Sequence, residues 1–406
     1  MPNIKRINAD QLRVGMYVAD LNNEWIPDNN LSRHGLIKRP EAIQQILKLG
    51  VTHVFIDTNK GEDCDEGISR LELDQQLNDE IDKIQRSIAA ADKNFSGKHG
   101  AEDFDSAKTI HLNALNLVSQ VMEDVKMGNA IDIRNVEDMA DDINESIRRN
   151  QNALSCFTRL RIKDEYLIEH SFSVAVLMGI LARSMGYNND DLHQLVTGGL
   201  LHDIGKVQVN DAILNKPGSL DTEEWEEMKR HVSYGEHILE QTSGVPTKIL
   251  QICAQHHERL DGTGYPRGLS GSALTEHGKM GAIVDVYDAI TADRVYHRGM
   301  LPTVAMKKLL EWSDGHLDKS ITYQFIACMS IYPAGSLVEL SNKQLALVSE
   351  PNLRQQHKPT VNVIFDCNNN KKLAPKLLNL AHSETQASIV KAVDPADFDI
   401  NIGDYL

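Results

Sequence analysis

Histidines and carboxylates stand together at several points of this sequence, a pattern typical of metal ligands. In LVTGGLLHDIGKV, His202 is followed directly by Asp203, and Lys206 comes three residues later. The stretch HHERLDGTGYPRGLSG opens with the pair His256 and His257. Imidazole and carboxylate groups without thiolates suit divalent iron, manganese, nickel or zinc, and one carboxylate can bridge two ions. The sequence therefore predicts a dinuclear site with mixed nitrogen and oxygen ligands.

Three further residues that could bind metal stand on helical stretches. His170 lies in EYLIEHSFSVAVLMG, His231 ends EEWEEMKRH, and Asp285 lies in MGAIVDVYDAI. A buried polar side chain needs a partner, so a single histidine on an apolar helix is usually a satisfied core residue. Asp288 shares a helix face with Asp285, which we favour as the ligand because its neighbours are apolar. Since adjacent helix residues point about 100° apart, the candidates can meet only between several helices of a bundle.

The periodicity of apolar residues predicts the elements that position these candidates. From residue 106 to about residue 328 nearly every segment has helical spacing, with long stretches at 166–186 and 190–206. Asp221 and Glu224 have the spacing of a capping box, which predicts that a helix begins there. The middle of the chain is therefore expected to be all-α.

Both ends of the chain have a different pattern. The first 60 residues combine the strand-like runs MYVADL and THVFIDT with the helical RPEAIQQILKLG, and SLVEL, QLALV and TVNVIF near the other end alternate like strands. We expect a mainly α protein with a helical bundle core, a small N-terminal α/β domain and a short C-terminal β-appendage. The predicted division is 1–60 for the α/β domain, 61–105 for an acidic and helical linker, 106–150 for a helical segment leading into the core, 151–340 for the domain with the candidate ligands, and 341–406 for the β-appendage.

An apolar stripe at helical spacing follows the acidic segment GEDCDEG. It consists of Leu73, Leu77, Ile81, Ile84 and Ile88. The stripe can pair two chains as a homodimer or pack on its own domain. The second outcome is the more common one, because two heptads are short for a coiled coil.

The composition excludes several classes of protein. Of 406 residues, 41% are hydrophobic and 25% are charged, as in folded globular proteins. A formal net charge of -16 argues against general attraction to nucleic acid polymers or anionic membranes. The N-terminus lacks the apolar core of a signal peptide, and the longest apolar run, VAVLMGILA, is too short to span a bilayer. Because the five cysteines are scattered, we expect a cytoplasmic protein in a reducing compartment.

Four blocks of the sequence, taken in order, resemble the HD-GYP family of the HD phosphohydrolase superfamily. They are the HD dipeptide followed by Ile-Gly-Lys, the capped helix with His231, HHERLDGTGYP, and VDVYDAITADRVY, all within residues 151–340. The resemblance implies an HD-type helical bundle and a metal-dependent phosphodiesterase that acts on cyclic dinucleotides, chiefly cyclic di-GMP, in bacterial signalling. Residues 1–60 also resemble the small domain that often precedes this module.

The resemblance also implies the metal ligands. Position by position they are His170, His202, Asp203, His231, His256, His257 and Asp285. Asp203 is expected to bridge two divalent ions, with iron or manganese first and nickel, magnesium or zinc as alternatives. Some members carry a glutamate four residues before the first histidine and bind a third ion. That position is Tyr166 here, so we expect two ions and faster cleavage of the first phosphodiester than of the second.

Two residues near the predicted ligands are candidates for substrate contact. Lys206 is placed to donate to a phosphate oxygen and to act in catalysis with Asp203, although a lysine at a helix end also complements the helix dipole. Pro266 restricts Tyr265 to an extended conformation, which presents one aromatic face to a nucleobase or to a signalling protein partner.

Four arginines could bind an anionic substrate. Arg294, just after VDVYDAITAD, matches the family's phosphate or base ligand. Arg259, Arg267 and Arg298 are weaker candidates, and each is expected to be a solvated surface charge.

The expected function is metal-dependent hydrolysis of cyclic di-GMP, 3',3'-cyclic GMP-AMP or both to the linear dinucleotide. Two alternatives stay open. One is a non-catalytic module that senses nucleotide and recruits a partner through the glycine-rich loop. The other is a different HD phosphohydrolase that acts on mononucleotides.

Overall fold

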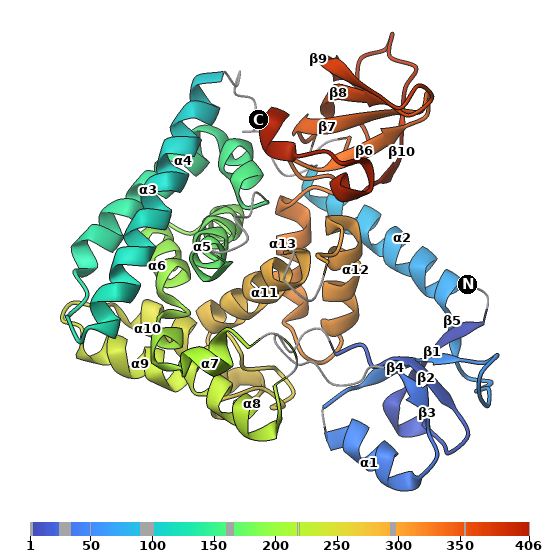
Figure 1. The fold of residues 1–406 in the computed structure, drawn as a ribbon, viewed down its shortest axis with the longest axis horizontal. Coiled ribbons are helices and arrows are strands. Elements are labelled where there is room, and N and C mark those ends of the chain that lie inside the picture. The colour runs from blue at the N-terminus through green and yellow to red at the C-terminus, as the bar shows by residue number, and fades with distance from the viewer. Residues whose placement is uncertain are drawn as a thin grey trace.

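Helices form the centre of the structure, and a small antiparallel sheet lies toward each end of the chain (Figure 1). The computed structural model describes residues 3–23, 34–48, 50–89, 101–159, 166–216, 218, 220–292, 298–352 and 355–405. In Figure 1 the helical core separates the blue N-terminal sheet from the red C-terminal sheet. The predicted mainly α fold class is confirmed.

The N-terminal sheet has the strand order β3-β2-β4-β1-β5. Its elements are β1 (Ile4–Asn8), β2 (Tyr17–Asp20), β3 (Gly35–Leu36), helix α1 (Pro40–Lys48), β4 (His53–Asp57) and β5 (Ile68–Ser69). Side chains alternate along β4, so Val54 and Ile56 pack in a small core of the sheet while Phe55 joins the core of the helices. The sheet thus shares a core residue with the rest of the molecule.

Helix α2 (Arg70–Ala89) carries the apolar stripe and packs on the same chain. Leu73, Leu77, Ile81 and Ile84 are buried in the main hydrophobic core, where α2 lies against α12 (Pro302–Trp312) and α13 (Lys319–Cys328). The side chain of Ile88 lies outside the described residues. Packing within the chain is therefore the outcome for this stripe, and a homodimer stays a prediction.

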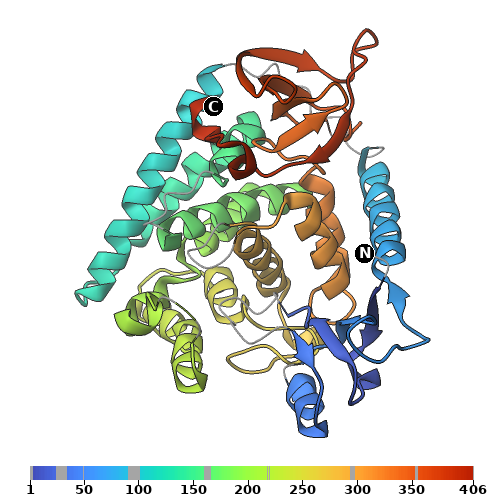
Figure 2. The same cartoon turned by 45° about the vertical axis from the view of Figure 1, so that its right-hand side comes forward.

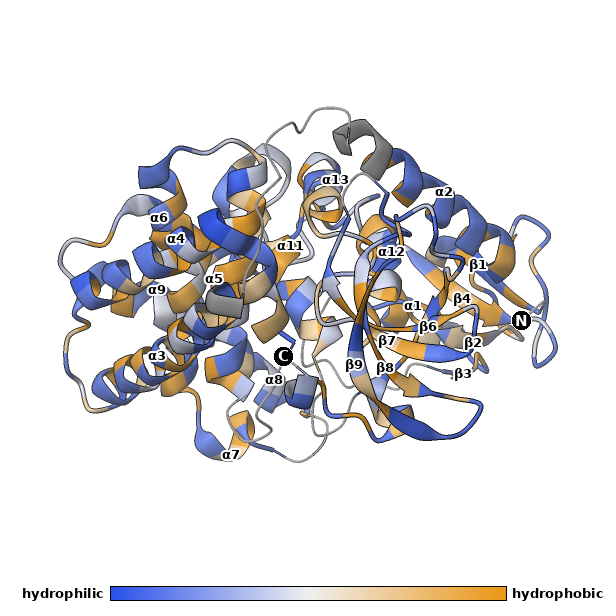
Figure 3. Cartoon of the chain, turned by 90° about the horizontal axis from the view of Figure 1, so that it is seen from above, coloured by the Kyte–Doolittle hydropathy of each residue, from blue (hydrophilic) through white to orange (hydrophobic). Residues whose placement is uncertain are grey.

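Helix α5 (Tyr166–Ser184) is the centre of the helical core. It packs against α3, α4, α6, α11 and α13, and in Figure 3 it is rich in orange, apolar positions. By length and composition α5 could cross a membrane, but 78% of its most apolar window is buried inside the fold, as in a core helix. The remaining helices of the core are α3 (Ala101–Lys126), α4 (Ile133–Phe157), α6 (Asn189–Leu201), α7 (Asp211–Leu214), α8 (Thr222–Lys229), α9 (His231–Gln241), α10 (Thr247–Gln255) and α11 (Glu276–Thr291).

The second long helical stretch ends earlier than predicted. Helix α6 stops at Leu201, and a separate 3-10 turn runs over Ile204–Gln208. Asp203, between them, has φ -102° and ψ 11°. A Cβ on Gly205 would lie 1.9 Å from the carbonyl oxygen of His231, so the backbone of α9 occupies the space that a side chain would need. The prediction of one helix to residue 206 is wrong: α6 ends at Leu201, and the turn that follows lies in close backbone contact with α9.

The C-terminal sheet has the strand order β10-β6-β7-β8-β9. Its strands are β6 (Leu337–Leu340), β7 (Gln344–Glu350), β8 (Thr360–Asp366), β9 (Lys371–Asn379) and β10 (Ile389–Ala392). Val338 and Leu340 face the main core, while Leu337 and Leu347 form a second cluster on the other face. The predicted strands are thus confirmed, and the division of the chain into domains stays a prediction.

Candidate metal centre

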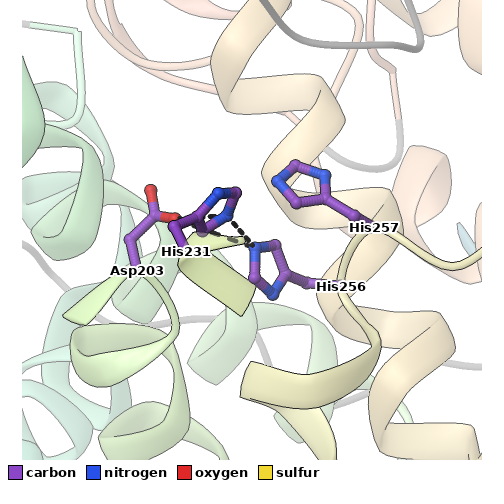
Figure 4. A group of neighbouring side chains, drawn as sticks. All are labelled: Asp203, His231, His256 and His257. Carbon is purple, nitrogen blue, oxygen red and sulfur yellow. Dashed lines mark hydrogen bonds and ion pairs between the residues drawn. The ribbon is translucent and has the colours of Figure 1, made fainter. Parts of the chain in front are cut away.

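The seven predicted ligands meet in the middle of the helical core. Their atoms form two groups, within each of which all ligand atoms lie within 4.8 Å of one another. The first group consists of Asp203, His231, His256 and His257, and the second of His170, His202 and Asp285. All seven side chains are buried, and Figure 4 shows the rings of the first group turned toward one another.

Asp203 lies between the two groups. Its Oδ1 is 3.3 Å from Nε2 of His231 and 3.7 Å from Nε2 of His256. Its Oδ2 is 3.4 Å from Nε2 of His202 and 3.5 Å from Nε2 of His170. Each carboxylate oxygen therefore faces histidines of one group, which is the arrangement that a bridging ligand needs.

The backbone orients three of the imidazoles. In His202, His231 and His256, Nδ1 lies 2.7 or 2.8 Å from the carbonyl oxygen three residues earlier. With the Nδ1–H donating to that carbonyl, the lone pair of each ring lies on Nε2, which faces Asp203. The tautomer that a metal ligand requires is thus set by the local chain.

A carboxylate outside the predicted ligand set orients His170. Its Nδ1 lies 2.6 Å from Oδ2 of Asp288, while its Nε2 lies 3.0 Å from Oδ1 of Asp285. Burial alone lowers the pKa of His170, but Tyr166 and hydrogen bonds with Asp285 and Asp288 outweigh it and raise the pKa to about 10. Asp288 therefore supports a ligand, and the favoured choice of Asp285 agrees with the geometry.

The electrostatics of Asp203 and His256 favour the forms that bind metal. Burial opposes the charge of Asp203, but Lys206, His202 and His231 outweigh it and hold the pKa of that carboxyl well below its usual range. Burial and the neighbouring His202 lower the pKa of His256 to about 3, so its ring is neutral at neutral pH. An ionised carboxylate beside a neutral imidazole is the ligand set that divalent metal ions need.

Buried atoms without hydrogen bonds indicate that the residues fit metal ions. Within the part of the chain that the structure describes, Oδ1 of Asp203, Oδ2 of Asp285 and Nδ1 of His257 are fully buried and form no hydrogen bond. Oδ2 of Asp285 and Nδ1 of His257 lie 3.6 Å apart. Leaving such groups unpaired in a dry core is costly, and nitrogen and oxygen donors suit divalent ions.

An aromatic ring and a buried carboxylate lie next to His170. The ring of Tyr166 is stacked on that of His170, with centroids 5.8 Å apart. Glu169 is buried, but its Oε2 lies 3.0 Å from Nε2 of His111 on α3. Glu165 lies outside the described residues. The position four residues before His170 is therefore occupied by an aromatic ring, and the number of ions stays a prediction.

Lys206 lies at the wall of the site. The 3-10 turn places its Nζ 2.7 Å from Oδ2 of Asp203, and the side chain is 11% exposed. Asp203 is the N-cap of that turn, so Lys206 is held beside the bridging carboxylate by a short segment of chain. A nearly buried ammonium at this place can donate to an anionic ligand.

The glycine-rich loop places Tyr265 over a predicted ligand. The ring stacks on that of His257, with centroids 4.6 Å apart and an angle of 26°. Trp225 meets the ring edge-on at 6.0 Å, and Nζ of Lys229 lies 5.9 Å from its centroid. Sequence reasoning missed Trp225 and Lys229, although the predicted capping box at Asp221 is confirmed and starts the helix that carries both.

The four arginines differ in their environments. Arg259 is 2% exposed, and its guanidinium donates to the carbonyls of His256 and Glu258. The prediction of a solvated charge is wrong for Arg259, because it binds the backbone beside the ligands. Arg267 and Arg298 are exposed, and Arg294 lies outside the described residues.

Comparison with known proteins agrees with this geometry. Residues 152–321 match the HD domain family, and residues 4–136 match a domain of unknown function (DUF3391). The chain is 33% identical over 395 residues to the cyclic di-GMP phosphodiesterase PA4108 of Pseudomonas aeruginosa, covering 97% of this chain and 93% of that protein. This chain belongs to the HD-GYP phosphodiesterase family. The expected family and enzyme class are therefore confirmed.

Other HD-GYP relatives match shorter parts of the chain. Identity to the 3'3'-cGAMP-specific phosphodiesterase 3 of Vibrio cholerae is 41% over 138 residues, which is 34% of this chain and 30% of that protein. Among solved structures, Bd1817 of Bdellovibrio bacteriovorus covers 80% of this chain and 98% of its own, with 20% identity and a TM-score of 0.47.

Substitution of Asp203 tests the bridge between the groups. We expect Asp203→Ala to lose metal from both groups and His202→Ala to lose it mainly from the second. Elemental analysis of each variant, purified with manganese, measures its total metal content. His193→Ala is the matched control, because His193 is a histidine with a 22% exposed side chain that pairs with Asp141 away from the site. Wild-type metal content in Asp203→Ala would contradict the bridging geometry.

Substitution of Asp288 tests the support of His170. Asp288→Asn should weaken manganese binding by about 10- to 100-fold, since partners that orient a ligand contribute to affinity on this scale. Competition with a chelator measures the affinity. Asp141→Asn changes an equally close aspartate–histidine pair away from the site and should have no effect. Equal manganese affinities of Asp288→Asn and Asp141→Asn would contradict a role of Asp288 in metal binding.

Proposed function

We propose that this chain hydrolyses a cyclic dinucleotide, either cyclic di-GMP or 3',3'-cyclic GMP-AMP, to the linear dinucleotide. The observation that carries the proposal is the position of Asp203, with one buried oxygen toward each group of ligands. A module that only binds nucleotide has no need for a carboxylate in that position. The names of the relatives PA4108 and the cGAMP-specific phosphodiesterase 3 support the substrate class.

Different residues of the chain bind the metal ions and contact the phosphate during hydrolysis. His170, His202, His231, His256, His257, Asp203 and Asp285 hold two divalent ions, with iron or manganese as first choice. When bound, such ions supply Lewis acidity toward phosphoryl oxygens and lower the pKa of water. Lys206 donates a charge-assisted hydrogen bond to a non-bridging oxygen or to the leaving oxygen, where negative charge grows.

Tyr265 and Arg294 are the proposed substrate-binding residues. One face of the Tyr265 ring rests on His257, which fixes the ring next to the metal ligands. Stacking on this ring does not discriminate between guanine and adenine, because every nucleobase can stack on an aromatic side chain. Arg294 binds a phosphate or a base edge.

The setting of the reaction follows from the rest of the chain. A net charge of -16 and a buried α5 support an enzyme of the cytoplasm that takes a small anionic substrate rather than a nucleic acid polymer. A signalling protein is the partner that the exposed part of the glycine-rich loop would bind.

Product analysis tests the reaction and the number of ions. The purified protein with manganese or iron should cleave both cyclic dinucleotides, and the linear dinucleotide should accumulate before any mononucleotide appears. Lys206→Met should lower kcat strongly and leave the metal content unchanged. Mononucleotide without a linear intermediate would contradict the order of cleavage, and absence of turnover with either metal would contradict the function.

Substitution of Tyr265 tests the stacking contact. Tyr265→Ala should raise KM by about 5- to 150-fold, which corresponds to about 1–3 kcal/mol for one stacked base. Tyr265→Phe keeps the ring and should retain the wild-type KM, while metal content stays constant in both variants. Kinetics on purified protein measures the effect, and an unchanged KM in Tyr265→Ala would exclude the ring as a substrate contact.

A further inference from the structure

The N-terminal sheet is joined to α12 through a buried lysine. Lys308 is 3% exposed, and its ammonium donates to Oδ1 of Asn22 over 2.6 Å. Oδ2 of Asp20 lies 3.7 Å from the same nitrogen, and the rings of Phe55 and Trp312 lie at 5.4 and 5.8 Å. Three of these four partners belong to the N-terminal sheet and its connections. A buried charge is strongly destabilising without its partners, so Lys308 fixes α12 to that sheet.

The turn after α12 continues this connection to the glycine-rich loop. The N–H of His316 donates to the carbonyl of Trp312 over 2.8 Å, and the carbonyl of His316 accepts from the N–H of Leu260 over 3.0 Å. His316 is buried, and its Nδ1 lies 2.9 Å from Oδ2 of Asp261. Oδ1 of Asp261 accepts from both the N–H and the hydroxyl of Thr263. The loop is therefore held by His316 at two consecutive residues, Leu260 and Asp261, and Asp261 in turn binds Thr263.

The segment before β4 also meets the loop directly. Gly50 has φ +74°, and a Cβ there would lie 2.6 Å from Cγ2 of Thr263. A Cβ on Gly315, beside His316, would lie 3.7 Å from Cγ2 of Thr52. Figure 2 shows the blue sheet below the yellow and orange segments that carry this loop and α12. The N-terminal unit thus contacts both the loop and the turn that holds it.

The held part of the loop leads to the substrate face. Tyr265 follows Thr263 by two residues, and its N–H donates to the carbonyl of His257 over 3.1 Å. Four of the proposed ligands, His170, His202, His231 and His256, are anchored separately, by carbonyls of their own segments and by Asp288. A movement at Asp261 therefore displaces Tyr265 more readily than it displaces these four ligands.

We propose that Asp261 and His316 are positioning residues for Tyr265, and that the N-terminal sheet holds this pair in place through Lys308. The proposal rests on the proposed function, in which Tyr265 contacts the cyclic dinucleotide. Because four of the ligands are anchored elsewhere, loosening the loop weakens substrate binding and leaves the chemical step intact. Any ligand or partner that shifts the N-terminal sheet then changes the substrate affinity of the enzyme.

Two substitutions at opposite ends of this connection test the proposal in the full chain. Asp261→Asn and Lys308→Met should each raise KM for cyclic di-GMP by about 3- to 10-fold, the scale of one lost hydrogen bond. Metal content and kcat with manganese should stay at the wild-type level. Lys307→Met is the matched control, because this neighbouring lysine of α12 lies 3.5 Å from Asp74 of α2 instead, and its KM should not change.

Amide hydrogen exchange supplies a measurement that needs no substrate. The amides of Leu260 and Thr263 should exchange faster in Asp261→Asn and in Lys308→Met, but not in Lys307→Met. Since Asp261 is near the surface, its variant keeps the test valid should Lys308→Met not fold. The proposal would be overturned if Asp261→Asn and Lys308→Met both kept the wild-type amide exchange and KM. It would also be overturned if these variants lost both kcat and bound metal.

The same measurements separate this proposal from the proposed function. Faster exchange in the loop together with an unchanged KM in Tyr265→Ala would refute the substrate contact and support the positioning of the loop. A raised KM in Tyr265→Ala with wild-type KM in Asp261→Asn would support the contact and overturn the positioning.

Discussion

A carboxylate buried among histidines is the interaction on which the structure of the site depends. Asp203 is 1% exposed and lies in a core that a helical bundle would otherwise fill with apolar side chains. An ionised group in such a place requires cations, and the nearest fixed one is the ammonium of Lys206 at 2.7 Å. The histidines at its other oxygen are oriented by backbone carbonyls. Each therefore carries its proton on Nδ1 and presents the unprotonated Nε2 to Asp203. Divalent metal ions would satisfy both the charge of Asp203 and the lone pairs of these Nε2 atoms.

Close backbone contacts give this carboxylate its position. Gly205 allows the turn after α6 to lie against α9, which carries His231. Gly264 likewise allows a close backbone contact within the glycine-rich loop, because a Cβ there would lie 2.4 Å from the backbone nitrogen of Arg259. Glu258 accepts from the N–H groups of Arg267 and Leu269 and closes the same loop. The chemistry at the centre thus depends on glycine positions where the chain has no room for a side chain.

The types and order of the ligands made most of the centre predictable from the sequence. His202 and Asp203 are adjacent, His256 and His257 are adjacent, and their helices have clear apolar periodicity. What could not be predicted depends on contacts between distant segments. The burial of Arg259, the support of His170 by Asp288 and the pair of Asp261 with His316 join residues whose spacing carries no signal. The end of α6 was also misplaced, and the turn that follows it packs closely on α9, a segment distant in the sequence.

Anomalous diffraction from crystals of the full chain grown with manganese tests the bridging role of Asp203 most directly. Two peaks about 3.5–4 Å apart are expected, the separation typical of paired catalytic ions. One peak should be bound by Oδ1 of Asp203 with the first group, and the other by Oδ2 with the second. A single peak, or two peaks with Asp203 bound to only one of them, would contradict a dinuclear centre built on this residue.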